Sequence, residues 1–67
     1  MTSYVLQNIT ERRKALRITQ RQMARLLQMD QSAYCRLEKG RTDLTLTHLE
    51  RISHALRVHP HHLLPPI

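Results

Sequence analysis

Five polar residues between positions 31 and 39 recur at helical spacing and together could bind the edges of nucleic-acid bases. They are Gln31, Ser32, Cys35, Arg36 and Lys39. At about 100° per residue they share one side of a helix, and the opposite side holds Ala33, Tyr34 and Leu37. Glutamine can pair with the adenine edge through its donor and its acceptor, and arginine can bind the two acceptors of guanine. The face suits a major groove, although an ordinary solvated helix face would have a similar composition.

The charge balance favours a polyanion as the partner. The chain has 11 Lys and Arg against 5 Asp and Glu, which gives a formal net charge of +6 over 67 residues. A chain of this length forms one domain at most and buries about 60% of its unfolded surface, so it has no room for a catalytic cleft. The sequence also lacks a nucleophile–base pair and a metal triad. We therefore expect no enzymatic activity and no cofactor.

The expected compartment is the cytoplasm. The single cysteine, Cys35, cannot form an internal disulfide. The longest apolar run falls far short of the roughly 20 residues that a membrane span needs. The first ten residues, MTSYVLQNIT, lack the basic start and apolar core of a signal peptide. No membrane partner is expected.

One pattern of residues recurs four times and predicts four helix starts. An apolar residue, a cap, three further residues and a second apolar residue appear as Ile18-Thr19-QRQ-Met23, Met29-Asp30-QSA-Tyr34, Leu44-Thr45-LTH-Leu49 and Val58-His59-PHH-Leu63. This is the hydrophobic staple, in which the residue before the cap packs on the fourth helical residue. Gln22 completes a capping box with Thr19. Thr19 and Asp30 are good N-caps, whereas His59 is a poor one.

The chain is therefore predicted to be all-α, with five helices in a single domain over 1–67. The expected helices run over about 3–16, 20–27, 31–39, 46–56 and 60–64. Gly40, the only glycine, is expected to end the third helix in a left-handed conformation. Apolar periodicity predicts two buried stripes, one formed by Met23, Ala24 and Leu27 and the other by Leu46, Leu49, Ile52 and Leu56.

An arginine interrupts the apolar stripe of the first helix. Leu6, Ile9, Arg13 and Leu16 share one face at helical spacing. A buried arginine needs an anionic partner, and Glu38, beside Tyr34 at the edge of a core face, is the candidate. Spacing alone leaves open whether Arg13 pairs with Glu38 or extends to solvent.

The sequence resembles a known family over about residues 6–64. The pattern I-T-Q-x-x-M-A-x-L-L, then Y-x-x-L-E-K-G-R, then L-x-x-L-x-x-I-x-x-A-L-x-V is similar to the phage repressor and Cro-type (XRE-like) family of bacterial DNA-binding domains. The resemblance implies a compact five-helix repressor-like domain. Its helix-turn-helix would comprise the second and third helices, with the second of that pair in the major groove.

The resemblance also implies roles for individual residues. Gln20 matches a glutamine that contacts the DNA backbone and neighbouring bases, whereas Gln31, Ser32 and Arg36 match base-reading positions. Arg13 and Glu38 match a pair that ties the first helix to the third. Lys39, Arg41 and Thr42 match a loop that meets phosphate. The full DNA-binding set that we expect is Gln20, Arg21, Gln31, Ser32, Cys35, Arg36, Lys39, Arg41 and Thr42.

The function that follows is sequence-specific binding of double-stranded DNA by a transcriptional regulator associated with the nucleoid. A homodimer on a palindromic operator is expected, because one small module gives limited specificity. Leu63, Leu64 and Ile67 are the candidate dimer patch. An antitoxin-like protein that binds DNA and also neutralises a protein partner is the alternative. General RNA or nucleoid binding is disfavoured because the chain has only two aromatic residues, Tyr4 and Tyr34.

Two departures from the family pattern and two chemical features complete the expectations. Gln28 and Arg57 stand where the family usually has glycine. If the backbone is left-handed at these positions, each non-glycine residue lowers the stability of the fold by roughly 1 kcal/mol.

Cys35 is expected to be a structural thiol rather than a redox sensor. The histidines predict no metal site, because HPHH is not a recognised ligand spacing. They are His48, His54, His59, His61 and His62.

Overall fold

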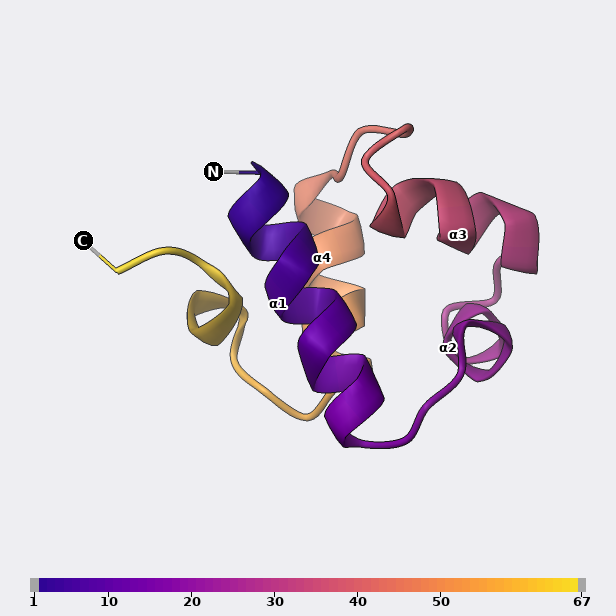
Figure 1. The fold of residues 1–67 in the computed structure, drawn as a ribbon, viewed down its shortest axis with the longest axis horizontal. Helices are drawn as coiled ribbons and strands as arrows, with labels where there is room; N and C mark the ends of the chain where they lie inside the picture. Colours follow the sequence, from indigo (N-terminus) through magenta and orange to yellow (C-terminus); the bar gives the residue numbers. More distant parts are fainter. Residues whose placement is uncertain (1, 67) are drawn as a thin grey trace.

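A computed structural model describes residues 2–66 and confirms the all-α class (Figure 1). Its elements are α1 (Thr2–Ala15), α2 (Gln20–Leu26), α3 (Gln31–Glu38), α4 (Leu46–Ala55) and the 3-10 helix η1 (Pro60–Leu63). The fifth predicted helix is therefore one short 3-10 segment and not an α-helix. Within the described residues, no helix has both the length and the apolar character needed to cross a membrane.

The elements are spread along the longest of three dimensions, 33 × 23 × 18 Å. Figure 1 shows α2 and α3 at one end of this axis and η1 at the other, with α1 and α4 between them. α2 packs against α3, whereas η1 packs against both α1 and α4. The pair α2–α3 and the C-terminal segment therefore form opposite ends of the molecule.

All four α-helices end in the same way. The residue after each C-cap is left-handed: Arg17, Gln28, Gly40 and Arg57 have φ of 59°, 57°, 77° and 59°. The next N–H donates to the carbonyl five residues earlier, for example from Met29 to Ala24 over 2.9 Å and from Val58 to Ser53 over 3.0 Å. This is the Schellman motif. Gln28 and Arg57 stand where the family pattern has glycine, and the condition that their backbone is left-handed is met; the left-handed Arg17 had no such signal.

After α1, α2 and α4, the residue that follows the left-handed position also begins the next staple. Ile18, Met29 and Val58 are partly buried against the core. Their staple partners are among the buried residues, which include Met23, Tyr34 and Leu63. One apolar side chain thus closes one helix and anchors the start of the following element. This double use explains how two helices can follow each other with so few residues between them.

The caps differ in how they act. Thr19 accepts a hydrogen bond from the Gln22 N–H, and the Gln22 side chain accepts one from the Thr19 N–H, which completes the predicted capping box. Thr45 caps α4 by accepting from the His48 N–H. The expectation for Asp30 needs correction, because its side chain makes no capping hydrogen bond. Since Asp30 has extended backbone angles, α3 begins through backbone geometry and the Met29–Tyr34 staple.

The core consists of twelve buried apolar residues from all five elements and the turns between them. It contains Val5, Leu6, Ile9, Met23, Ala24, Leu27, Tyr34, Leu37, Leu49, Ile52, Leu56 and Leu63. Two leucines predicted to share these faces are exposed instead. Leu16 lies beyond Ala15, where α1 has already ended, and Leu46 is the first residue of α4 and is 71% exposed. Helical side chains lean toward the N-terminus, so a first-turn residue reaches past the packed layer.

The C-terminal segment also departs from expectation. Leu63 is 3% exposed and belongs to the core, and its carbonyl accepts a hydrogen bond of 3.2 Å from the Asn8 side chain. Leu63 therefore cannot contribute its side chain to a dimer surface as predicted. Leu64 is partly exposed, and Ile67 lies outside the described residues.

Candidate nucleic-acid interface

A tight turn joins α2 to α3. Leu27 caps α2, Gln28 turns left-handed, and Asp30 has extended angles before α3 begins. Arg51 of α4 donates from its guanidinium to the Leu27 carbonyl. This hydrogen bond ties the end of α2 to α4, because the last carbonyls of a helix lack partners within it. No spacing in the sequence indicated this role for Arg51.

The two sides of α3 differ in burial, as the sequence predicted. Tyr34 and Leu37 are buried in the core and hold the helix against the domain. Four of the expected DNA-binding residues on the other side are exposed, namely Gln31, Ser32, Arg36 and Lys39. Cys35 shares this other side, is half-buried and is a free cysteine. α3 therefore presents donors and acceptors outward while its inner side is fixed.

The segment after α3 continues the same exposed surface. Gly40 has φ of +77°, a backbone conformation that residues with a side chain rarely adopt. A Cβ built at this position would lie 3.2 Å from Leu6 Cδ1. The N–H of Arg41 donates to the Arg36 carbonyl over 2.9 Å. Arg41 and Thr42 are exposed, as is Arg21 on α2. Arg41 and Thr42 follow α3 closely in the chain, and Arg21 lies on α2, the helix that packs against α3.

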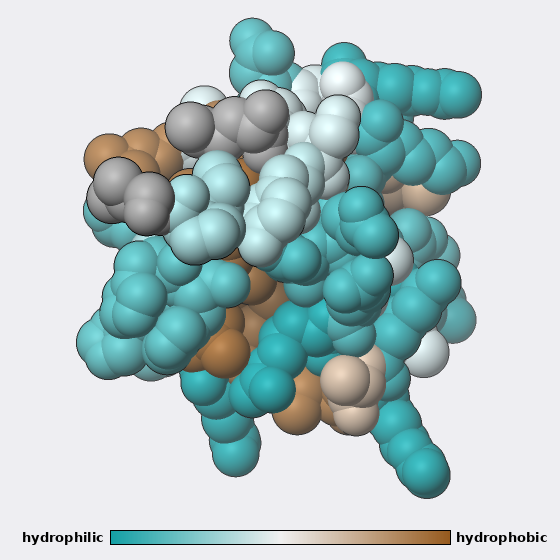
Figure 2. All heavy atoms as spheres, turned by 60° about the vertical axis from the view of Figure 1, so that its left-hand side comes forward, coloured by the Kyte–Doolittle hydropathy of each residue, from teal (hydrophilic) through white to brown (hydrophobic). Residues whose placement is uncertain are grey.

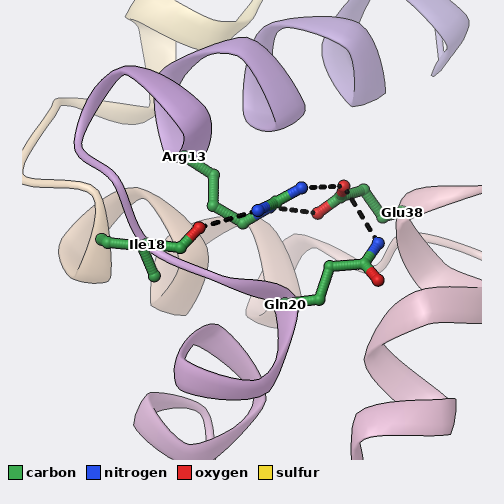
Figure 3. A network of polar contacts seen from close by, with 4 residues as sticks. All are labelled: Arg13, Ile18, Gln20 and Glu38. Carbon is green, nitrogen blue, oxygen red and sulfur yellow. Dashed lines mark hydrogen bonds and ion pairs between the residues drawn. The ribbon is translucent and has the colours of Figure 1, made fainter.

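An ion pair connects α1 to α3 behind this surface (Figure 3). Arg13 donates through Nε to Glu38 Oε2 and through Nη2 to Glu38 Oε1, each over 3.0 Å. The Arg13 and Glu38 side chains are 8% and 5% exposed. Arg13 Nη1 also donates to the Ile18 carbonyl over 2.7 Å. The pair is therefore bidentate, buried and joined to the start of the α2 segment.

Gln20 joins the same network. Its Nε2 donates to Glu38 Oε1 over 3.3 Å, and Figure 3 shows the amide turned toward that carboxylate. Gln20 is half-buried, whereas Arg21 beside it is exposed. Among the expected DNA-binding residues, Gln20 thus has an intramolecular partner that the sequence did not reveal. Glu38 holds α1 and the first residue of α2 in a fixed relation to α3.

The electrostatics of the pair follow from burial and charge. Burial alone would raise the pKa of the Glu38 carboxyl, but hydrogen bonds, the strongest from Arg13, outweigh this effect and hold the pKa below its usual value. The hydrogen bond to Glu38 raises the pKa of Arg13. Burial also raises the pKa of the Tyr34 hydroxyl above its ordinary value. Arg13 and Glu38 are therefore both charged at neutral pH.

Three histidines cluster at the far end of the molecule from α3. The ring centroids of His59, His61 and His62 lie between 4.2 and 6.1 Å apart. Among residues 2–66, no group of three or more potential ligands could hold a metal ion. This cluster is separate from the surface formed by α3 and the residues that follow it.

Comparison with known families agrees with this arrangement. A family model described as helix-turn-helix matches residues 9–63. The chain belongs to the helix-turn-helix family. The match confirms the resemblance to phage repressor and Cro-type domains, which are DNA-binding regulators. The helix-turn-helix match includes all of α2, α3, α4 and η1 and the second half of α1. No curated protein and no solved structure matches the chain.

Proposed function

We propose that this helix-turn-helix protein is a sequence-specific transcriptional regulator that binds double-stranded DNA. In this proposal residues 1–67 form one DNA-binding domain, α2 and α3 form the helix-turn-helix, and α3 lies in the major groove. The observation that carries the proposal is the two-sided burial of α3. Its Tyr34 and Leu37 side is buried, and its opposite side exposes Gln31, Ser32 and Arg36.

The exposed residues divide into two chemical roles. Gln31, Ser32 and Arg36 have donors and acceptors that match base edges, with Arg36 suited to guanine and Gln31 to adenine. The other exposed residues, Arg21, Lys39, Arg41 and Thr42, contact phosphates and fix the position of α3 without reading sequence. Cys35 lies on the same side of α3 and is half-buried. The net charge of +6 supports the phosphate contacts.

Gln20 occupies an intermediate position in this scheme. Because its amide donates to Glu38 over 3.3 Å, its side chain meets DNA in an orientation that the protein sets in advance. A contact from Gln20 to the DNA backbone would then position α2 across the groove, as the first helix of the motif requires. Glu38 and Arg13 act on DNA binding through this positioning and not through contact.

Two copies on a palindromic operator complete the proposal. A single module of this size makes few base contacts, whereas two half-sites one helical turn or a multiple apart multiply the specificity. Selection of bound sequences from random duplex DNA tests both statements. The proposal expects a palindromic consensus. A consensus with one half-site would contradict the dimer alone, and no enrichment of any sequence would contradict sequence-specific binding.

A further inference from the structure

Two arginines from outside the α2–α3 pair hydrogen-bond at its two ends. Arg13 of α1 binds Glu38, the last residue of α3, and the Ile18 carbonyl, which precedes α2. Arg51 of α4 donates from Nη2 to the Leu27 carbonyl, at the turn between α2 and α3. α2 packs chiefly on α3, and α3 also packs on α1. The pair is therefore held by core packing and by one arginine at each end.

The turn between α2 and α3 has little other support from side-chain hydrogen bonds. Gln28 is left-handed, with φ of 57°, which disfavours a residue that has a Cβ. Asp30 makes no capping hydrogen bond to α3. Among residues 2–66, the only side-chain hydrogen bond to residues 27–30 comes from Arg51. Arg51 thus supplements the backbone hydrogen bonds and the partly buried Met29, which shape the turn from within.

The same kind of contact occurs at each α-helix end that lacks glycine. Three helices end in a left-handed residue other than glycine, namely Arg17, Gln28 and Arg57. A guanidinium donates to a neighbouring carbonyl at each of these ends, namely that of Ile18, Leu27 and Leu56. Such donors satisfy carbonyls that lack a partner within the helix. Arg51 serves the one of these ends that lies between α2 and α3.

We propose that Arg51 is a positioning residue for DNA recognition, which fixes the α2–α3 turn and does not itself contact DNA. The inference rests on the proposed function and names a residue that sets its specificity. Gln31 and Ser32, two of the base-reading side chains, are the first residues of α3 and closely follow the turn. Recognition groups must be held within about 0.5 Å of the productive geometry, whereas sequence-independent phosphate binding tolerates a shift. Without Arg51, the turn can move about the Arg13 anchor and displace these side chains from the bases.

The variant Arg51→Met removes the guanidinium and keeps an apolar stem, and Arg12→Met is its matched control. Arg12 Nε donates to the Leu56 carbonyl over 3.4 Å, at the end of α4. Arg12→Met therefore removes the same charge and the same kind of hydrogen bond outside the α2–α3 pair. Both arginines are exposed. Hydrophilic residues make up most of the face shown in Figure 2, so one exposed methionine leaves each variant with a polar surface.

Both variants and the wild-type chain are titrated with selected operator DNA and scrambled DNA at several salt concentrations. Arg51→Met should lower the ratio of operator affinity to scrambled affinity at least about tenfold, while its salt slope on scrambled DNA equals that of Arg12→Met. Arg12→Met should keep the wild-type ratio. Arg51→Lys should restore part of the ratio, because an ammonium group also donates to a carbonyl. Should Arg51→Met unfold, Arg51→Gln takes its place, since its side chain is shorter and uncharged.

Two results of this titration would overturn the proposal. An equal loss of affinity for both DNAs, with a salt slope about one unit lower than that of Arg12→Met, would show that Arg51 contacts phosphate. A wild-type affinity ratio in Arg51→Met would show that the hydrogen bond to Leu27 has no effect on recognition.

Hydrogen exchange of the free protein separates this inference from the proposed function. The amides of residues 27–29 donate hydrogen bonds that close the end of α2, and they should exchange faster in Arg51→Met but not in Arg12→Met. If they do and the wild-type chain prefers no DNA sequence, Arg51 restrains the turn and the proposed function fails. If the wild-type chain selects an operator and this exchange is unchanged in Arg51→Met, the function stands and the positioning role fails.

Discussion

Arg13 and Glu38 form a bidentate ion pair that fastens α1 to α3, with both hydrogen bonds at 3.0 Å and both side chains almost fully buried. Removal of one partner of a buried pair leaves an uncompensated charge and costs about 3–5 kcal/mol. We expect Glu38→Ala to lower the thermal midpoint sharply, because the total stability of a domain is of the same order. A midpoint within a degree or two of the wild-type value would show that the pair contributes little.

The same pair predicts how stability depends on acid. The folded pKa of Glu38 lies below its ordinary value of 4.5, so its contribution is present above pH 4.5 and is lost as the pH falls through the lower folded pKa. Glu38→Gln removes this titration while keeping the shape. Wild-type protein should be the more stable of the two at neutral pH, and the difference should shrink below pH 4.5. Thermal midpoints of both proteins across acidic pH measure this difference in stability. A difference between the two midpoints that stays constant with pH would contradict the prediction.

The left-handed residues predict opposite effects of substitution at two helix ends. Arg57 has φ of 59°, and a non-glycine residue in that conformation costs about 1–2 kcal/mol. Arg57→Gly should therefore stabilise the domain by about 0.5–1 kcal/mol after the entropy of glycine is counted. Gly40→Ala should destabilise it, because Gly40 is left-handed and a Cβ would lie 3.2 Å from Leu6 Cδ1. Urea unfolding of both variants measures the two changes in the free energy of unfolding. Changes of the same sign in the two variants would refute the explanation.

Much of the fold could be predicted because the relevant signals are local. Thr19 with Gln22, Gly40, and the staple residues Ile18 and Met29 each act through neighbours within a few positions along the chain. The Arg13–Glu38 pair is a contact across the fold. Spacing indicated Glu38 as a candidate partner but left open whether Arg13 pairs with it or extends to solvent, and the resemblance favoured the pair.

The wrong predictions concern residues whose burial depends on three-dimensional packing or on the exact end of a helix. Leu16 fits the apolar stripe of α1, but α1 ends at Ala15, and Leu46 precedes the packed layer of α4. Leu63 was predicted to form part of a dimer patch at the surface. η1 instead packs against both α1 and α4, and Leu63 belongs to the core. The hydrogen bonds from Gln20 and Arg51 depend on elements distant in sequence, so no local pattern could reveal them.

The central claim is that α3 reads bases, and a comparison of Arg36→Ala with Arg41→Ala tests it most directly. Arg36 lies on the exposed side of α3, and Arg41 lies beyond Gly40, off the helix. Loss of a bidentate guanine contact by Arg36→Ala should cost about 1–3 kcal/mol on the operator and relax the preference at one position. Loss of a phosphate contact by Arg41→Ala should weaken binding to all duplexes alike and lower the salt slope by about one unit.

The measurement is a titration of both variants and the wild-type chain against selected operator DNA and scrambled DNA at several salt concentrations. We predict that Arg36→Ala loses affinity for the operator while its affinity for scrambled DNA changes little, and that Arg41→Ala loses affinity for both. An equal loss by Arg36→Ala on the two DNAs would contradict the account, because Arg36 would then contact phosphate and α3 would not be the base-reading helix.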